Sequence, residues 1–304
     1  MSILEALFLG VVQGLTEFLP VSSSGHLVLF QKLFGLKDVP LLFDTLLHCG
    51  TLLAVFVALW DDIWPLIQRP FQKTTYLVIV ATLPTVVIAL LFKDSIETAF
   101  STGAWLGWGF LLTTTFLLVG EILSRRFIPQ NTAAETGTTQ GPEAPGVAQP
   151  PVLAPRDTAH HHKGLPIKDA AQMGYLRALF VGLMQGIAIF PAISRSGSTI
   201  AGGLMAGCER SYAGRFSFLM AIPAIPGALV FQLKDIMHEG PGMLGAVSVS
   251  ALVVGTAAAA ITGFLAIKLL LRILQKGRLW GFACYTGLLA LLILLDQYLV
   301  HLVF

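Results

Sequence analysis

Charged residues are scarce in this sequence of 304 residues, where Asp, Glu, Lys and Arg together make up only 12%. Soluble domains usually carry about 25%. Hydrophobic residues reach 55%, and the mean hydropathy is +0.77. The composition therefore excludes an ordinary soluble domain and predicts an all-α protein that crosses a membrane several times.

Features of several other classes are also missing. The formal net charge is only +2, and no basic run is interleaved with aromatic residues, so nucleic acid is not an expected partner. The three cysteines, Cys49, Cys208 and Cys284, lie in apolar contexts without metal-ligand spacing and are expected to be small buried side chains. No basic segment precedes the first apolar run, so we expect mature chain rather than a signal peptide.

One stretch is polar where its surroundings are apolar: QGLTEFLPVSSSGH, at residues 13–26. It contains the carboxylate Glu17, three consecutive serines and the imidazole His26. Polar and ionisable groups are costly inside an apolar chain unless they have partners or a function. We therefore expect this stretch to line a site.

A second stretch repeats the first. Shifting the sequence by 172 positions aligns Leu7–Gly25 with Leu179–Gly197, and 9 of the 19 aligned pairs are identical. The second copy lacks the equivalent of Glu17 and gains Arg195. Because one copy carries the acid and the other the guanidinium, we expect them to supply unlike partners of a single site.

Both polar stretches interrupt apolar segments that are shorter than the roughly 20 residues of a spanning helix. Such segments predict two re-entrant helix pairs whose polar turns face a pocket. The first pair is expected at 3–19 and 25–36, and the second at 172–193 and 197–208. Six full spans are predicted at 40–60, 74–92, 103–123, 214–232, 244–270 and 279–303.

The sequence thus predicts one integral membrane domain, residues 1–304, made of a first repeat (1–128), a loop (129–171) and a second repeat (172–304). The loop is rich in Pro, Gly, Thr and Ala, which is typical of disorder. It contains three adjacent histidines, His160, His161 and His162, which we interpret as incidental rather than metal-binding.

The distribution of Lys and Arg gives an orientation. If each re-entrant pair enters and leaves the membrane on the same side, four loops share one face of the membrane. These loops hold 14 of the 19 Lys and Arg residues and comprise 61–73, 124–177, 209–215 and 268–278. The other face holds four, so the first face is expected to be cytoplasmic and both termini periplasmic. The two re-entrant pairs then enter from opposite faces, as in an inverted repeat, and Arg195 lies in the membrane facing Glu17.

The polar residues suit a phosphate. We expect short helices to begin at His26 and near Ser198, where free backbone N–H groups attract anions and Gly25 and Gly197 let the backbone close around the ligand. Arg195 offers a permanently charged fork for phosphate oxygens. A carboxylate repels phosphate unless it is protonated, holds a cation or acts as a base. Together with a serine or imidazole nucleophile, the guanidinium, the carboxylate and the helix starts are the groups that a phosphatase active site needs.

Each residue also has a structural interpretation. Glu17 could simply pair with Arg195, and His26 could be a hydrogen-bonding residue of the framework. Ser22, Ser23 and Ser24 could cap helices, and Thr199 could be a first-turn hydroxyl. Asp44 and His48 lie four residues apart, on one helix face. For them we favour an ordinary hydrogen-bonded pair over a cation site beside the pocket.

QGLTEFLPVSSSGH followed by PAISRSGST, together with FDTLLHCGTLLAV and FSFLMAIPAIPGAL, resembles the bacterial undecaprenyl pyrophosphate phosphatases, also called bacitracin-resistance proteins. The resemblance covers nearly the whole chain apart from residues 129–164. It implies a multi-pass inner-membrane enzyme with its active site open to the periplasmic side. Such an enzyme removes the terminal phosphate of a C55 isoprenyl pyrophosphate and so regenerates the carrier for peptidoglycan and other cell-wall synthesis.

Site residues follow from the resemblance. Glu17, Ser23, His26 and Arg195 are the expected catalytic residues, without a choice between Ser23 and His26 as nucleophile. A divalent cation, Mg²⁺ or Ca²⁺, is the expected cofactor, with Glu17 as its ligand or neighbour. The expected substrate-binding residues are Gln13, Ser22, Ser24, Gly25, Ser194, Ser196, Gly197 and Thr199.

Two positions depart from the family pattern. Many members have Glu where Gln13 stands, which removes one candidate metal ligand. Pro191-Ala192 replaces the usual Pro-Gly, so this turn must form without a glycine.

A transporter or flippase of a polyprenyl phosphate is the alternative function, because inverted repeats are also transporter architecture. Small-residue faces at 201–207 and 251–260 allow close helix packing, within one subunit or between the subunits of a homodimer.

Overall fold

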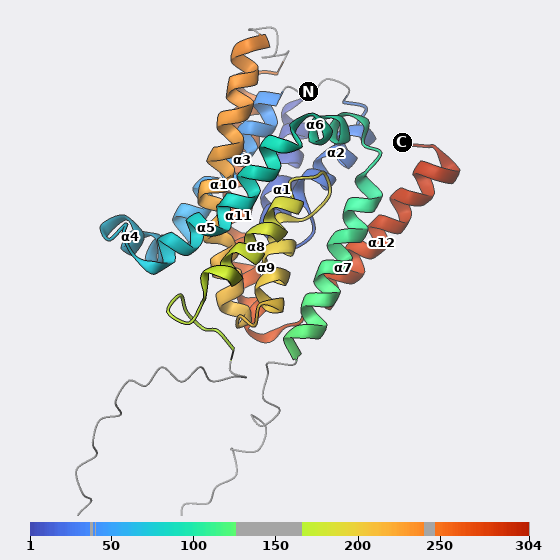
Figure 1. Cartoon of the computed structure of the whole chain (residues 1–304). Coiled ribbons are helices and arrows are strands. Elements are labelled where there is room, and N and C mark those ends of the chain that lie inside the picture. Colours follow the sequence, from blue (N-terminus) through green and yellow to red (C-terminus); the bar gives the residue numbers. More distant parts are fainter. Residues whose placement is uncertain (37–38, 40, 126–165, 240–246, 304) are drawn as a thin grey trace, which may run out of the picture.

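The computed structural model describes residues 1–36, 39, 41–125, 166–239 and 247–303, and in this part of the chain the regular structure is helical (Figure 1). The predicted disordered tract and its three histidines lie outside the described residues. The N-terminal half contains α1 (Ile3–Phe18), α2 (Ser23–Leu33), α3 (Leu41–Ala58), α4 (Trp60–Gln68), α5 (Lys73–Leu91), α6 (Lys93–Thr102) and α7 (Leu106–Ser124). The C-terminal half contains α8 (Tyr175–Ile187), α9 (Arg195–Met205), α10 (Arg210–Glu239), α11 (Val249–Lys276) and α12 (Trp280–Leu295), which continues as a π-helix (Asp296–Val300).

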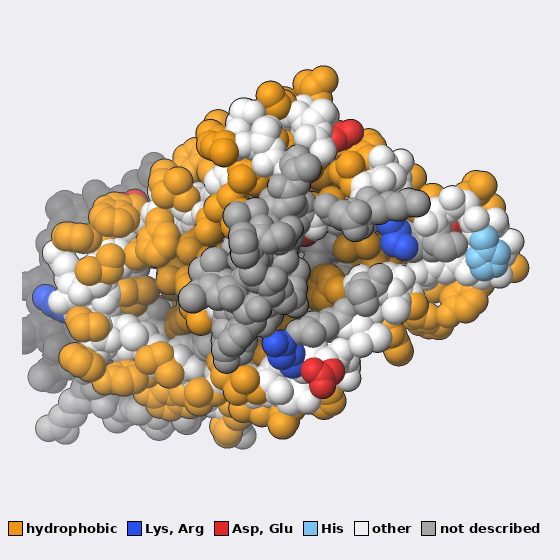
Figure 2. All heavy atoms as spheres, turned by 90° about the horizontal axis from the view of Figure 1, so that it is seen from above, with side chains coloured by type: hydrophobic (Ala, Val, Ile, Leu, Met, Phe, Trp, Pro, Cys, Tyr) orange, Lys and Arg blue, Asp and Glu red, His pale blue; other side chains and the backbone are white. Residues whose placement is uncertain are grey.

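Five of the described helices are long and apolar enough to cross a membrane, namely α5, α7, α10, α11 and α12 with its π-helical end. A sixth span results if α3 and α4, which are bent by 83° relative to one another, count as one. Hydrophobic side chains dominate the described surface seen in Figure 2. The prediction of an all-α, multi-pass membrane protein is therefore confirmed.

The four helices next to the polar turns are short, as predicted, but two of them begin earlier than expected. Helix α2 starts at Ser23 rather than His26, and α9 starts at Arg195 rather than near Ser198. The physical reason is the helix cap: the side chains of Ser22 and Ser194 each accept a hydrogen bond from the backbone N–H three residues on. Ser23 and Arg195 are consequently first-turn residues, where side chains can face the site.

Glycines bring the short helices against long ones. A Cβ at Gly14 of α1 would lie 2.0 Å from the Thr262 Oγ1 of α11, and one at Gly182 of α8 would lie 2.0 Å from the Ala81 carbonyl oxygen of α5. Only glycine permits such close approach. Small residues of the faces noted in the sequence pack inside the subunit in the same way, with Ala201 against Gly120. Residues 251–260 also contribute to the outer surface, where Val253 is 61% exposed.

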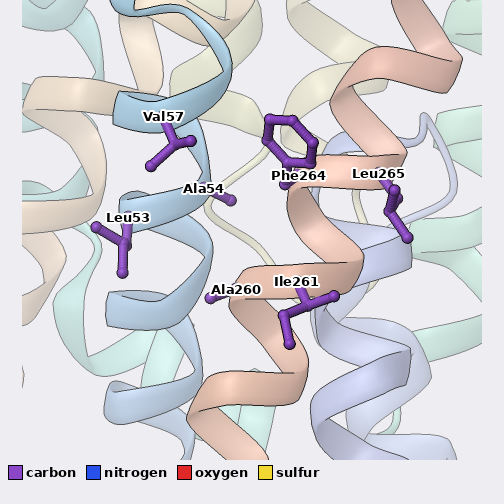
Figure 3. Close-up of a pocket in the computed structure, with 7 residues that line it drawn as sticks. All are labelled: Leu53, Ala54, Val57, Ala260, Ile261, Phe264 and Leu265. Carbon is purple, nitrogen blue, oxygen red and sulfur yellow. The ribbon is translucent and has the colours of Figure 1, made fainter.

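The outer faces of α3 and α11 form a shallow apolar groove with a volume of about 250 Å³ (Figure 3). Leu53 and Val57 of α3 and Ile261 of α11 line it and are more than half exposed. Such exposure suits contact with hydrocarbon rather than water. The prediction of buried cysteines is confirmed for Cys208 and wrong for Cys284, which is exposed on α12.

A buried ion pair joins α7, α10 and the segment before α12. Arg210 of α10 donates to Glu121 Oε2 of α7 at 2.8 Å and to Ser124 Oγ at 2.9 Å. The backbone N–H of Leu279, before α12, donates to the same carboxylate oxygen at 3.1 Å. Glu121 is only 1% exposed, so its charge depends on these partners.

Arg210→Met should destabilise the protein by about 3–5 kcal/mol, because it removes the closest cation of the buried Glu121 carboxylate and leaves only Arg125 Nε, at 4.0 Å from Oε1. The matched control is Arg215→Met on the same helix, whose ion pair with Asp62 is half exposed and should contribute less than about 1 kcal/mol. Thermal or denaturant unfolding in detergent measures both. Equal losses in the two variants would contradict this assignment.

Candidate active site

The two polar turns meet. Arg195, the first residue of α9, donates from Nη2 to Glu17 Oε1 at 2.8 Å. The carboxylate lies near the end of α1 and is 6% exposed, while the guanidinium side chain is 15% exposed. The acid of one repeat and the guanidinium of the other are therefore in contact, as the sequence repeat predicted.

The second carboxylate oxygen of Glu17 gathers three further side chains. Ser23 donates its hydroxyl proton to Glu17 Oε2 at 2.6 Å, and Gln13 donates from Nε2 at 3.1 Å. His48 Nε2 of α3 lies 3.9 Å from the same oxygen. A serine whose proton already points at a carboxylate has the arrangement of an activated nucleophile with its base.

His26 is held from both sides. Its Nδ1 lies 2.6 Å from the Ser22 carbonyl oxygen, to which it donates, and its Nε2 lies 2.7 Å from the hydroxyl of Tyr285 on α12. The imidazole stacks on the Tyr285 ring and makes an edge-to-face contact with the Phe110 ring. Only 3% of the His26 surface is exposed. Because both ring nitrogens have partners, neither is free to attack a substrate in this arrangement.

Two serines brace the turns against one another. Ser24 Oγ accepts a hydrogen bond from the backbone N–H of Ala192 at 3.3 Å, and Ser196 Oγ donates to the Leu19 carbonyl oxygen at 3.1 Å. The two serines occupy equivalent positions in the repeats, and each contacts the turn of the other copy. Ser22, by contrast, caps its own helix, as its structural interpretation proposed.

The glycines of the two motifs serve packing. A Cβ at Gly25 would lie 2.5 Å from the Phe110 ring, and one at Gly197 would lie 3.0 Å from the Ser194 side chain. Thr199 Oγ1 donates to the Arg195 carbonyl oxygen at 2.8 Å and lies 2.6 Å from Ser217 Oγ of α10. These contacts fix the first turn of α9, which carries the guanidinium.

The turn that lacks the expected glycine places Ala192 at φ 62°, in the left-handed region. Thr113 of α7 holds this turn, because its Oγ1 donates to the Ala192 carbonyl oxygen at 3.3 Å and accepts from the Ser194 N–H at 2.9 Å. Ala192 is fully buried. A non-glycine residue in this conformation costs roughly 1–2 kcal/mol, so the surroundings impose it.

Four residues of the site lie outside the two polar stretches: Thr113, Ser217, Tyr285 and His48. Ser217 and His48 belong to the longer segments that carry the family resemblance, and only His48 was considered individually, as the neighbour of Asp44. Its Nδ1 contacts the backbone carbonyl oxygen of Asp44 at 2.7 Å, while the Asp44 carboxylate accepts from Gln31 at 3.1 Å. The imidazole thus faces Glu17 and not the Asp44 side chain.

This arrangement combines a permanent cation, a carboxylate and a hydroxyl at two helix starts, which is the chemistry of phosphoryl transfer. No cluster of three or more His, Cys, Asp or Glu side chains suited to a metal ion occurs among the described residues. Three buried side-chain oxygens of the two motif regions have no hydrogen-bond partner: Gln13 Oε1 beside Glu17, Gln185 Oε1 at the equivalent position of the second copy, and Ser198 Oγ of α9.

Comparison with known proteins gives consistent matches over the whole chain. The family model of the bacitracin resistance protein BacA matches residues 6–292. An undecaprenyl-diphosphatase of Carboxydothermus hydrogenoformans is 40% identical over 297 residues, covering 98% of each chain. An undecaprenyl-diphosphatase of Halothermothrix orenii is 38% identical, covering 97% of this chain and 98% of its own.

Ala192→Gly should change the free energy of unfolding by less than about 1 kcal/mol, because relief of the left-handed conformation offsets the loss of one buried methyl group. Ala192→Val should destabilise by more than about 2 kcal/mol, since a β-branched residue tolerates this φ poorly and its methyls would press on Gly25 and Gly109. Thermal unfolding of both variants checks this. A valine variant as stable as the parent would refute the strained turn.

Proposed function

The chain belongs to the bacitracin resistance protein BacA family, and we propose that it is an undecaprenyl-diphosphatase. It hydrolyses undecaprenyl diphosphate to undecaprenyl phosphate and inorganic phosphate, which recycles the lipid carrier for cell-wall synthesis and gives resistance to bacitracin. The observation that carries this conclusion is the 40% identity to a protein of that name over 98% of both chains. The alignment includes both polar turns.

The transporter alternative receives no comparable support. Both relatives reported above are named for hydrolysis of a diphosphate. In addition, the Ser23 hydroxyl has a carboxylate acceptor at 2.6 Å, which a site that only carries a phosphate has no need of.

In the mechanism that we propose, the diphosphate binds between the starts of α2 and α9 with its terminal phosphate on Arg195. Ser23 Oγ attacks the terminal phosphorus while Glu17 Oε2 accepts the hydroxyl proton. The bond between this phosphorus and the bridging oxygen breaks, and undecaprenyl phosphate leaves. Water then hydrolyses the phosphoserine, and Glu17 returns the proton to Ser23.

The ion pair between Glu17 and Arg195 determines the order of these reaction steps. Glu17 and the phosphate compete for the same guanidinium, because Arg195 donates to the carboxylate at 2.8 Å before substrate binds. Once Glu17 has taken the serine proton it is neutral, and its attraction for the guanidinium falls. Arg195 is then available to the transferring phosphoryl group at the moment when that group needs charge stabilisation.

His26 orients the nucleophile in this proposal and does not attack. Its two hydrogen bonds hold the Ser22 carbonyl and the start of α2, which fixes the direction of Ser23. The remaining binding residues form the frame of the anion site: Ser22 and Ser194 as caps, Ser24, Ser196 and Thr199 as braces, and Gly25 and Gly197 as packing positions. Gln13 orients the carboxylate.

The expected divalent cation fits the residues present. Glu17 supplies a carboxylate oxygen, and Gln13 Oε1 is a buried oxygen without a partner beside it. Oxygen ligands from one carboxylate, an amide and the substrate phosphates suit Mg²⁺ or Ca²⁺. A bound cation would neutralise charge on the diphosphate oxygens.

We also propose the inverted repeat of six spans and two re-entrant pairs, with the site open to the periplasm and both termini on that side. Corresponding helices have corresponding neighbours, which supports this arrangement: α1 packs on α11 as α8 packs on α5. The reciprocal bonds of Ser24 and Ser196 have the same symmetry. Figure 1 shows both termini at one end of the molecule.

Arg195→Ala and Glu17→Ala should each lower the rate of phosphate release at least about 100-fold, because each removes a group that the transition state needs. The measurement uses detergent-solubilised protein with polyprenyl diphosphate and a divalent cation, since no gradient for transport exists there. Arg215→Ala, at an exposed ion pair, is the control and should retain full activity. Near-normal turnover and an unchanged KM in Arg195→Ala would refute the mechanism. No release from folded, cation-supplied parent would refute the phosphatase itself.

Acid quenching during turnover of a substrate labelled in its terminal phosphate should trap phosphate on Ser23, because its hydroxyl is the one bonded to Glu17. Ser23→Ala should abolish the trapped label, whereas His26→Gln should slow turnover and still form the phosphoserine. A label that survives in Ser23→Ala, or that lies on His26, would assign the nucleophile differently.

A further inference from the structure

His48 is the site residue to which the mechanism so far gives no role. Its Nδ1 lies 2.7 Å from the backbone carbonyl oxygen of Asp44, and a carbonyl can only accept, so Nδ1 carries the proton of this bond. In the neutral imidazole, Nε2 is then left with a free lone pair. That nitrogen lies 3.9 Å from Glu17 Oε2. The His48 side chain is 29% exposed and the Glu17 side chain 6%, so the imidazole lies at the more open side of the carboxylate.

We propose that His48 Nε2 and Glu17 Oε2 together hold the divalent cation, an inference that rests on the proposed function. Histidines that bind metal usually donate their other ring N–H to a carboxylate or a backbone carbonyl, which fixes the tautomer and aims the lone pair. His48 has this arrangement before any ion is present. Helix α3 thereby supplies a ligand from outside both polar stretches.

Gln13 offers a further oxygen for such an ion. Its Nε2 donates to Glu17 Oε2, so the other amide atom, Oε1, must accept, yet it is fully buried and has no partner. A buried acceptor without a partner costs about 1–3 kcal/mol. Since no third His, Cys, Asp or Glu completes a metal cluster in the described part of the chain, Gln13 Oε1, phosphate oxygens and water would fill the other positions.

The distances allow this coordination after a small movement. Two ligands at right angles on one ion, each about 2.1 Å from it, lie roughly 3 Å apart. His48 Nε2 must therefore approach Glu17 by about 1 Å. Arg195 bonds the other carboxylate oxygen, Oε1, so the guanidinium and the cation do not compete for one atom. Their mutual repulsion is offset by Glu17 and the diphosphate between them. Ser23 and Gln13 already donate to Oε2, so the cation displaces one of these hydrogen bonds when it binds, and it must move onto the phosphate oxygens before Oε2 takes the serine proton.

A nitrogen ligand changes which ion the site prefers. Mg²⁺ and Ca²⁺ favour oxygen ligands, whereas imidazole suits later first-row transition ions such as Fe²⁺, Ni²⁺ and Zn²⁺. Mn²⁺ lies at the weak end of that series and also favours oxygen, but it accepts an imidazole nitrogen more readily than Ca²⁺ does. This chain should accordingly bind Mn²⁺ more tightly than Ca²⁺. His48→Gln, which offers an amide oxygen from the same place, should lower Mn²⁺ affinity at least about tenfold and reduce the preference for Mn²⁺ over Ca²⁺.

Pulsed electron paramagnetic resonance of bound Mn²⁺ tests the inference without any turnover. The sample is the full-length protein in detergent with Mn²⁺, alone and with methylenediphosphonate as a diphosphate headgroup that cannot be hydrolysed. All variants are made with His160, His161 and His162 replaced by Ser and without a histidine tag, because free imidazoles would bind Mn²⁺ themselves. Histidine labelled with ¹⁵N identifies the coupled nucleus.

We expect an imidazole nitrogen coupling on Mn²⁺ in the parent, its loss in His48→Gln, and its retention in His26→Gln, the matched control whose Nε2 is bonded to Tyr285. Glu17→Gln should weaken Mn²⁺ binding in parallel. A coupling that persists in His48→Gln, or a folded parent that binds Mn²⁺ without nitrogen coupling, would overturn the inference. So would an absence of Mn²⁺ binding with the diphosphonate present.

Phosphate release measured on the same samples separates this inference from the proposed function. Turnover by a parent that shows no nitrogen coupling would leave the phosphatase standing and remove His48 as a ligand. If the parent shows a nitrogen coupling that depends on His48 but releases no phosphate, the metal site would stand and the proposed phosphatase activity would be refuted.

Discussion

The contact between Glu17 and Arg195 is the constraint on which the rest of this structure depends. A carboxylate and a guanidinium that lie 2.8 Å apart and almost out of reach of water must stay together, since either one alone would be a buried, unpaired charge. They are 178 residues apart and lie on different short helices. The two polar turns therefore have to meet, and the surrounding helices are arranged so that they do.

The meeting of the turns is secured by neutral contacts as well as by charge. Glycines set α1 against α11 and α8 against α5, at distances that a side chain would prevent. The hydroxyls of Ser24 and Ser196 then bond the backbone of the opposite turn. Such a rigid frame can hold Ala192 in the left-handed region and keep Ser23 directed at Glu17. The bonds that stabilise the centre of the fold are thus the same ones that orient the reacting groups.

Much of this was predictable from the sequence. The apolar segments and their lengths predict the long helices and the short ones, and the repeat predicts that Glu17 and Arg195 face each other. The predicted starts of α2 and α9 were wrong, because the side chains of Ser22 and Ser194 cap these helices about three residues before the predicted positions. The glycines Gly25 and Gly197 lie against side chains that the sequence did not identify as their neighbours, Phe110 and Ser194.

By itself, the sequence determined the class of protein, the position of the polar turns and the chemical groups that they carry, because composition, segment length and a long repeat are local properties of the chain. Only the tertiary structure decided which further residues join those groups. His48, Thr113, Ser217 and Tyr285 come from α3, α7, α10 and α12, and each reaches the site through a single contact or a few contacts across helices. No sequence spacing encodes such contacts, since they depend on the angle and rotation at which separate helices pack. The tautomer and direction of His48, on which its proposed role as a cation ligand depends, exist only in the folded chain.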